Sequence, residues 1–179
     1  MTMNKINITI PEGYEIDEKN STFKCIKFKP VKKQEFEYVN LGLPSGTLWA
    51  TCNVGAKKPE EYGKLLSYDS VVNKYELPTL GQIKELIEFC DWKYVNYNKV
   101  NGYLVIGTNG KSIFLPAAGY RNDTSLNYAG SVGYYWSRTL STDYPINAWY
   151  LDFFSVNVYT YYYSRYNGLS VRPVFNTKI

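Results

Sequence analysis

The sequence contains no histidine, and this absence excludes several classes of enzyme. Catalysis by Ser-His-Asp or Cys-His groups, zinc sites of the HExxH type and the commonest proton shuttle all require an imidazole. The chain also lacks a GxxxxGK(S/T) phosphate-binding loop and a GxGxxG that follows a strand. In GLPSG, residues 42–46, Ser45 stands one place too late for a nucleophile elbow. We therefore expect that the protein is not an enzyme.

Acidic residues offer little for catalysis or for metal binding in the C-terminal half. Asp123, Asp143 and Asp152 are candidates for the carboxylate pair of a glycosidase, but each stands in polar or aromatic surroundings without a second acid nearby. Calcium could use Asp123 or Asp143 with Asn122, but no DxDxDG-like spacing of ligands exists. Solvated loop aspartates are the better interpretation, and we expect neither a metal nor a cofactor.

Cysteine and long apolar runs are also scarce. Cys25, Cys52 and Cys90 are odd in number and widely spaced, and no CxxC is present, so we expect no disulfide framework, although one pair stays open. The first residues lack the apolar core of a signal peptide. No apolar run approaches the ~20 residues that span a bilayer. We expect synthesis in the cytoplasm and no insertion into a membrane.

Lysine and glutamate are nearly absent from the C-terminal third. The last glutamate is Glu88, and after Lys111 the only lysine is Lys178, whereas the 179-residue chain carries 19 tyrosines. Depletion of Lys and Glu with enrichment of Tyr, Ser and Asn is typical of recognition surfaces. The net charge is +4 and no basic run exists, so nucleic acid is not indicated as a partner.

The segment from residue 144 to residue 167 combines a core pattern with a tyrosine-rich one. Trp149, Leu151 and Phe153 alternate as one face of a strand, and we expect them in the core. Residues 161–163 are consecutive tyrosines, which cannot all face one core. We expect the remaining positions to be presented to solvent as a ligand-binding surface, with Arg138 and Arg165 nearby. These positions are Tyr144, Ile146, Asn147, Tyr150, Asp152, Phe154, Asn157, Tyr159, Tyr161, Tyr162, Tyr163, Ser164, Tyr166 and Asn167.

One helix is predicted, from Leu80 to Cys90. Thr79 is a suitable N-cap, and Gln82 completes a capping box. From Trp92 onward the chain is typical of strands and loops, and Asn-Gly pairs at residues 101–102 and 109–110 indicate hairpin turns. One early helix followed by a strand-rich, loop-rich half predicts an α+β fold. The helix face expected in the core consists of Leu80, Ile83, Ile87 and Cys90.

Residues 1–34 are expected to form a β-hairpin or attachment segment ahead of a ligand-binding domain at residues 35–179. Ile6, Ile8 and Ile10 alternate as one strand, residues 22–28 form a second, and residues 30–37 read as a charged linker. Two short strands alone are marginal in water. This segment must therefore dock on the domain or on another protein, and a partly ordered leader is the alternative.

Four motifs together resemble the C-type-lectin-like domains of bacterial and phage proteins, in the branch that includes formylglycine-generating-enzyme-like domains. The resemblance covers residues 38–175 and implies a C-type-lectin-like fold. The motifs are GLPSGTLWATCNVGA (42–56), ELPTLGQIKELIEFC (76–90), GYYWSRTL (133–140) and GLSVRPV (168–174).

Within that branch the chain resembles the variable proteins of diversity-generating retroelements, which include phage tropism determinants. In these systems an error-prone reverse transcriptase replaces template adenines, so an AAY codon for Asn becomes one of a limited set that includes Tyr, Ser, Phe, Ile and Asp. Every position of the expected ligand-binding surface is Asn or can be reached from AAY. The resemblance implies a variable region at roughly residues 134–174. An AT-rich genome or a plain lectin surface is the alternative explanation.

The chain departs from related families in two respects. It lacks the Glu-Pro-Asn or Gln-Pro-Asp sugar motif of calcium-dependent lectins, and its last cysteine, Cys90, precedes the C-terminal part in which formylglycine-generating enzymes carry redox-active cysteines. We therefore expect a non-enzymatic protein that binds a protein or cell-surface receptor and is displayed on a virion, attached to a phage particle or larger protein through residues 1–34. A fixed-specificity adhesin that binds carbohydrate is the alternative.

Overall fold

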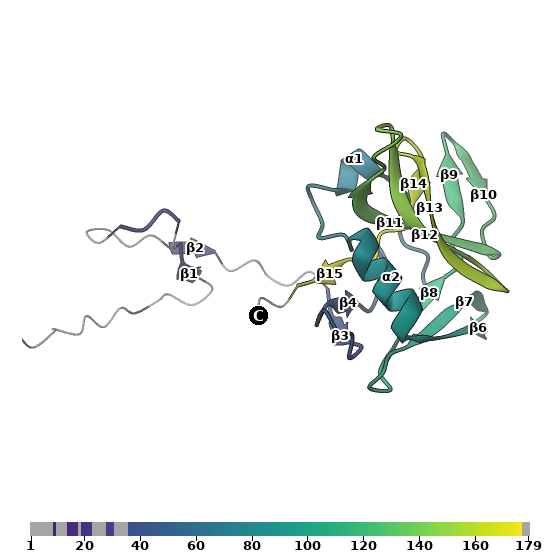
Figure 1. The fold of residues 1–179 in the computed structure, drawn as a ribbon, viewed down its shortest axis with the longest axis horizontal. Coiled ribbons are helices and arrows are strands. Elements are labelled where there is room, and N and C mark those ends of the chain that lie inside the picture. The colour runs from purple at the N-terminus through teal and green to yellow at the C-terminus, as the bar shows by residue number, and fades with distance from the viewer. Residues whose placement is uncertain (1–8, 10–13, 18, 23–27, 31–35, 177–179) are drawn as a thin grey trace, which may run out of the picture. The chain divides into compact units, whose positions relative to one another are not determined.

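The computed structural model describes residues 9, 14–17, 19–22, 28–30 and 36–176 (Figure 1). The chain divides into two units, Met1–Glu35 and Phe36–Ile179, one residue after the boundary expected from the sequence. In the first unit, β1 (Tyr14–Ile16) pairs antiparallel with β2 (Phe28–Pro30). The expected strand of Ile6, Ile8 and Ile10 lies outside the described residues.

The second unit contains two helices and thirteen strands among its described residues. The helices are α1 (Tyr68–Val71) and α2 (Leu80–Phe89). The strands are β3 (Tyr38–Asn40), β4 (Leu48–Ala50), β5 (Leu66–Ser67), β6 (Asp91–Tyr97), β7 (Val100–Ile106), β8 (Ser112–Pro116), β9 (Tyr120–Asn122), β10 (Ser125–Asn127), β11 (Val132–Leu140), β12 (Asn147–Phe154), β13 (Asn157–Ser164), β14 (Gly168–Leu169) and β15 (Val174–Phe175).

The expected α+β fold of the C-type-lectin-like kind is wrong, because the described residues are mostly β-sheet. The strands of the second unit form four small antiparallel sheets, in the orders β15-β4-β3, β6-β7-β8, β11-β12-β13 and β10-β9-β14-β5. Helical patterning is confined to the short α2, whereas the aromatic and β-branched segments around it satisfy their backbone groups by pairing with one another. A helix of this length covers part of one sheet and does not form a layer of its own.

The helix α2 confirms its predicted start. The Thr79 side chain accepts from the backbone of Gln82, and the Gln82 side chain accepts in return from the backbone of Thr79, so the capping box is present. The helix ends at Phe89, one residue before the expected end. Ile83 and Leu86 are its buried residues. In Figure 1 the helix lies beside β11 and β12.

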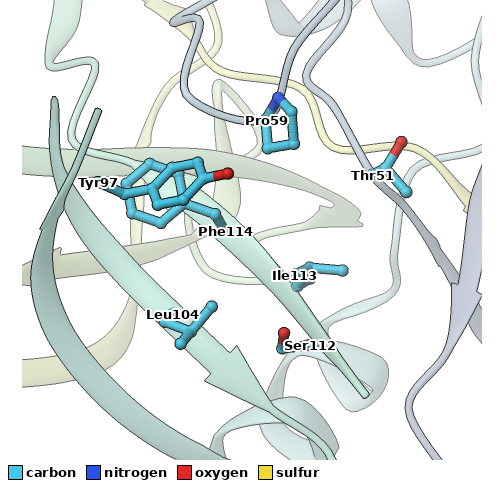
Figure 2. A pocket seen from close by; sticks show the side chains of 7 residues that line it. All are labelled: Thr51, Pro59, Tyr97, Leu104, Ser112, Ile113 and Phe114. Carbon is cyan, nitrogen blue, oxygen red and sulfur yellow. The ribbon is translucent and has the colours of Figure 1, made fainter. Parts of the chain in front are cut away.

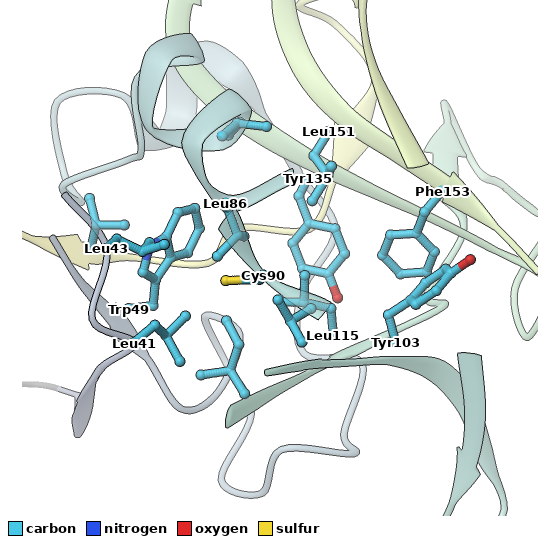
Figure 3. Close-up of a cluster of buried hydrophobic side chains, with 14 of the residues drawn as sticks. Leu41, Leu43, Trp49, Leu86, Cys90, Tyr103, Leu115, Tyr135, Leu151 and Phe153 are labelled. Atoms are coloured by element: carbon cyan, nitrogen blue, oxygen red, sulfur yellow. The ribbon is translucent and has the colours of Figure 1, made fainter. Parts of the chain in front are cut away.

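The main core lies between α2, the sheet of β11 to β13 and the sheet of β6 to β8. Figure 3 shows Leu86 and Cys90 between Trp49 on one side and Leu115 and Tyr135 on the other, with Phe153 beyond Tyr135. The rings of Tyr135 and Phe153 are stacked with their centroids 5.9 Å apart. Burial of these side chains fixes the sheet that carries the tyrosine-rich segment.

Arg172 joins three distant segments from within the core. Its side chain is fully buried, and it donates to the Asn53 side chain at 2.9 Å, to the Ala50 carbonyl at 2.9 Å and to the Phe114 carbonyl at 2.7 Å. Burial lowers its pKa. Because every one of these bonds crosses between segments far apart in the sequence, Arg172 holds the C-terminal residues to the rest of the domain.

The hairpin turns agree with the sequence in one case and differ in the other. Asn109-Gly110 lies between β7 and β8 as predicted, with Gly110 at φ 79°. Asn101-Gly102 lies inside β7, and the turn before it is made by Asn98 and Lys99 at φ 48° and 69°. This strand position requires glycine, because a Cβ at residue 102 would lie 2.3 Å from the carbonyl oxygen of Leu115 on the neighbouring strand. Neither described helix is long and apolar enough to span a bilayer.

Candidate ligand-binding face

The candidate site is built on the sheet of β11, β12 and β13, in which β12 is the central strand. Tyr150 stands opposite Trp136 of β11, and Leu151 stands opposite Tyr135. Successive residues of a strand point to opposite faces. Leu151 and Tyr135 accordingly pack in the main core, whereas Tyr150 and Trp136 pack in a second cluster on the opposite face.

Of the three residues of this segment that we expected in the core, Trp149, Leu151 and Phe153, two are buried. Leu151 and Phe153 are fully buried. Trp149 is only half-buried, and the Tyr162 ring meets it edge-on with centroids 5.4 Å apart. The expectation that Trp149 is a core residue is therefore wrong: its partner on β13 is a partly exposed tyrosine and not a core side chain.

The residues predicted to bind a ligand differ widely in exposure. The exposed ones are Tyr144, Ile146, Asn157, Tyr159, Tyr161 and Tyr166. The half-buried ones are Asn147, Phe154, Tyr162, Tyr163 and Ser164. The buried ones are Tyr150, Asp152 and Asn167. We call the exposed and half-buried members of this set the tyrosine-rich surface.

The expectation that Tyr150, Asp152 and Asn167 face solvent is wrong. The face of β12 that carries Tyr150 is covered by the second buried cluster, and the rings of Tyr134 and Tyr163 lie 5.6 Å and 6.2 Å from that of Tyr150. Asn167 turns inward after β13, and its side chain donates to the Ser164 carbonyl at 3.2 Å. Strand alternation alone did not indicate that a second sheet would cover the other face.

Three tyrosine rings, of which two are exposed and the middle one is half-buried, form a stack at the edge of the sheet. The rings of Tyr144 and Tyr162 are stacked 5.4 Å apart, and those of Tyr162 and Tyr161 are stacked 4.9 Å apart. Tyr144 comes from the loop before β12, whereas the other two come from the edge strand β13. The stack gives the tyrosine-rich surface a rigid aromatic ridge.

A second group of tyrosines was not predicted as part of the site. Tyr120 of β9 meets Tyr134 at 5.3 Å and Tyr163 at 5.6 Å, both edge-on. Tyr128 lies 6.1 Å from Tyr120, is exposed, and has a φ of 56°, which is uncommon outside glycine. These rings extend the aromatic region from β13 across to β9. Only the general richness in tyrosine pointed to them.

Asp152 is the chemically unusual residue of the site. It is 6% exposed, so the expectation of a solvated loop aspartate is wrong for this position, whereas Asp123 and Asp143 are exposed. The Tyr150 hydroxyl donates to Oδ2 at 3.4 Å, and Oδ1 has no hydrogen-bond partner among the described residues. Burial raises the pKa of Asp152, although hydrogen bonding from Tyr159 and Tyr150 acts in the opposite direction.

The two arginines expected near the site are engaged by acidic residues. Arg138 forms an ion pair with Glu76 at 2.5 Å. Arg165 forms one with Asp69 at 3.1 Å, and its guanidinium lies 5.8 Å from the centre of the Tyr68 ring. Arg165 also donates to the Pro145 carbonyl at 3.3 Å, which ties down the loop that carries Tyr144. Arg165 therefore positions the aromatic ridge.

Two pockets lie away from the tyrosine-rich surface. One, of about 260 Å³, is lined by apolar side chains such as Leu104, Ile113 and Phe114, with the Tyr97 ring beside that of Phe114 and Pro59 opposite Leu104 (Figure 2). The other, of about 400 Å³, is lined by residues that include Lys64 and Arg121. No residue predicted to bind the ligand lines either pocket. The candidate site is thus a surface and not a cavity.

No group of three or more acidic or cysteine side chains in the described part of the chain is placed to hold a metal ion. Cys52 and Cys90 are free thiols, and Cys25 lies outside the described residues. Burial, together with Asp91 and Glu85, raises the pKa of Cys90 to about 11, so this thiol stays protonated at neutral pH.

Comparison with known proteins gives one match. Residues 88–174 match the sequence model of a family described as a domain of unknown function, DUF8237. The matched segment contains β11, β12 and β13, and therefore the whole tyrosine-rich surface. No curated protein and no solved structure matches the chain.

Proposed function

We propose that the protein is a non-enzymatic binding protein whose tyrosine-rich surface takes up a protein or cell-surface receptor. The observation that carries this proposal is the exposure of tyrosines on a sheet with a buried core. Tyr166 is 83% exposed and Tyr161 is 52% exposed, on either side of the end of β13. Tyrosine offers a large contact area, few rotors to immobilise and a hydroxyl for hydrogen bonding.

The composition of this surface supports recognition of another macromolecule. It carries no Lys or Glu, and its members from Tyr144 to Tyr166 come from two strands and the loops beside them. A standard interface buries about 800 Å² on each partner. A surface of this many side chains is large enough for such an interface, and neither of the two pockets described above lies on it.

We also propose that these positions are diversified by a retroelement, and that residues 1–34 attach the domain to a phage particle or a larger protein. The support is that every predicted position is Asn or reachable from an AAY codon. The buried positions Tyr150 and Asp152 would then be changed together with exposed ones. The flanking DNA tests this origin: a near-copy of the 3′ end, with adenines at these codons, should lie beside a reverse transcriptase gene.

Binding itself is tested with a triple variant, Tyr159→Ser, Tyr161→Ser and Tyr166→Ser. Fluorescently labelled protein is added to a panel of bacterial cells, and Tyr97→Ser, which removes an exposed tyrosine of β6, is the matched control. We expect the triple variant to lose binding while the control keeps it, and protease treatment of the cells to abolish binding. Undiminished binding by the triple variant would contradict the proposal.

Carbohydrate is the alternative ligand, because the exposed rings of Tyr144 and Tyr161 could also stack on sugars. In the same assay, competition by soluble sugars together with resistance to protease treatment would favour a fixed-specificity adhesin over a receptor-binding protein.

A further inference from the structure

The Asp152 carboxylate has no counter-charge of its own. It lies in the central strand β12, opposite Tyr134 of β11 and Tyr159 of β13. The ion pairs of the described residues join Arg138 to Glu76 and Arg165 to Asp69, and neither includes it. Burial of an ionised carboxylate is costly unless the group is paired and hydrogen-bonded. Oδ1 nevertheless lacks a partner within the described part of the chain.

The surroundings of Asp152 are aromatic. Tyr134 and Tyr150 have their ring centroids 5.6 Å apart, and the rings of Phe154 and Tyr159 lie 6.3 Å apart. The negative charge of Asp152 adds to burial in raising the pKa of Tyr134, Tyr150 and Tyr159, which places all three side chains within its electrostatic reach. Tyrosine rings beside a carboxylate offer π-faces and a full negative charge together, the combination that attracts an organic cation.

The covering side chain can move. Tyr159 is 41% exposed and belongs to the edge strand β13, and its side chain hydrogen-bonds with Asp152 and meets the ring of Phe154 edge-on. Exposed side chains change rotamer within nanoseconds. Asp152 is held in the central strand opposite Tyr159, so rotation of the Tyr159 side chain would break the hydrogen bond between them and free an acceptor on the carboxylate.

We propose that the tyrosine-rich surface recognises a cationic side chain, the guanidinium of arginine or the ammonium of lysine on a protein partner, which enters beside Tyr159 and pairs with Asp152. This inference rests on the proposed function and names the chemistry of its partner. A cation compensates the charge that the protein leaves unpaired, which a neutral donor does not. A hard metal ion would need further oxygen ligands from acidic groups, and the described residues place no such cluster here.

The proposal is tested with a pair of small probes that differ mainly in charge. The ¹⁵N-labelled protein is titrated with Nα-acetyl-arginine amide and with Nα-acetyl-citrulline amide, its neutral near-isostere, and the amide resonances of residues 134, 152 and 159 are followed. We expect saturable shifts with the arginine probe and roughly tenfold or more weaker binding of the citrulline probe, because hydrogen bonds to charged groups are the stronger ones. Equal responses to the two probes overturn the proposal, and no variant is needed to reach that result.

A matched pair of variants locates the site. Asp152→Asn should weaken the arginine probe by roughly tenfold or more, whereas Asp143→Asn, which removes the same charge from an exposed loop, should leave its affinity unchanged. Asp152→Asn should also melt at an equal or higher temperature at neutral pH, because it removes an uncompensated buried charge. Retained affinity in Asp152→Asn, or a loss of affinity matched by a loss of stability, overturns the assignment.

The failure of this inference can be told apart from the failure of the proposed function. If the arginine probe does not bind but the triple tyrosine variant still loses binding to cells, the surface binds a partner without a cation at Asp152. If the arginine probe binds at Asp152 but the tyrosine changes leave cell binding intact, the proposed function is wrong.

Discussion

The two buried charged side chains of the described residues, Arg172 and Asp152, differ in how their surroundings satisfy them. Arg172 donates to three acceptors at 2.9 Å or less. Asp152 accepts a hydrogen bond of 3.4 Å from Tyr150 and also hydrogen-bonds with Tyr159, but its Oδ1 has no partner among the described residues. Removing a buried group that makes all of its hydrogen bonds leaves its partners unpaired and destabilises the fold. Neutralising a buried charge that lacks hydrogen bonds removes the free-energy cost of burying that charge. Arg172 is therefore structural, and Asp152 is the group whose protonation is coupled most directly to stability.

The pH dependence of stability should report the burial of Asp152. Its pKa in the folded protein lies above its ordinary value of 3.8. A raised pKa means that the folded state holds the proton more tightly, so the contribution to stability is full below pH ~3.8 and is lost as pH rises through the folded value. The facing groups, Tyr134, Tyr150 and Tyr159, have raised pKa values of their own and stay neutral in this window.

Urea denaturation of the wild type and of Asp152→Asn between about pH 3 and pH 8 measures this effect. The stability of Asp152→Asn relative to the wild type should increase across the window and then become constant, since other carboxylates contribute equally to both proteins. A difference that does not change with pH would show that Asp152 has an ordinary pKa.

At the level of elements, most local signals in the sequence were correct, although the Asn101-Gly102 pair lies in a strand and not in the turn that it indicated. The capping box of Thr79 and Gln82 and the Asn109-Gly110 turn depend on residues close in sequence, and both are present. The turn at Asn98 and Lys99 contains no glycine and gave no signal. The strand expected from the alternation of Trp149, Leu151 and Phe153 is present as β12, because alternation is a local property.

The buried part of the candidate site could not be predicted, because it depends on which sheet covers β12. Tyr120 of β9 reaches the same face through its contact with Tyr163, and Leu169 of β14 joins Tyr150 in one cluster. These strands are paired with each other across a long stretch of chain, with Gly168 opposite Arg121. Composition and alternation carry no information about which distant strands pair, so the burial of Asp152 could not be predicted from them.

The two sides of the tyrosine-rich segment should respond differently to truncation. Trp136 is fully buried, its indole donates to the Leu66 carbonyl at 2.8 Å, and its ring meets that of Tyr68 edge-on. Trp136→Ala should therefore cost ~3–5 kcal/mol of unfolding free energy, whereas Tyr161→Ala should cost less than ~1 kcal/mol. Urea denaturation measures both, and a comparable loss at Tyr161 would show that this ring is structural and not available to a partner.

At the scale of the molecule, we expect that the segment matching the domain of unknown function is not a complete folding unit. The matched residues 88–174 contain Leu151 and Phe153, but the core that buries them also contains Leu41, Trp49 and Leu86 from outside the match. Without those three residues, the apolar side chains of the main sheet that pack against them would be exposed to solvent. The residues N-terminal to the match are thus needed to hold the tyrosine-rich surface in shape.

Two fragments should separate the folding unit from the matched segment. All residues of both buried clusters lie within residues 36–179, so this fragment should unfold cooperatively and keep the near-ultraviolet circular dichroism of its packed aromatic rings. A fragment of residues 88–179 lacks Leu41, Trp49 and Leu86. Each such loss from a core costs ~2–5 kcal/mol, so the three losses together are comparable to the whole stability of a typical domain. This fragment should show no cooperative thermal transition. Cooperative unfolding of the shorter fragment would mean that the sheet of β11 to β13 is stable without the helix α2, and that the tyrosine-rich surface does not depend on the first half of the domain.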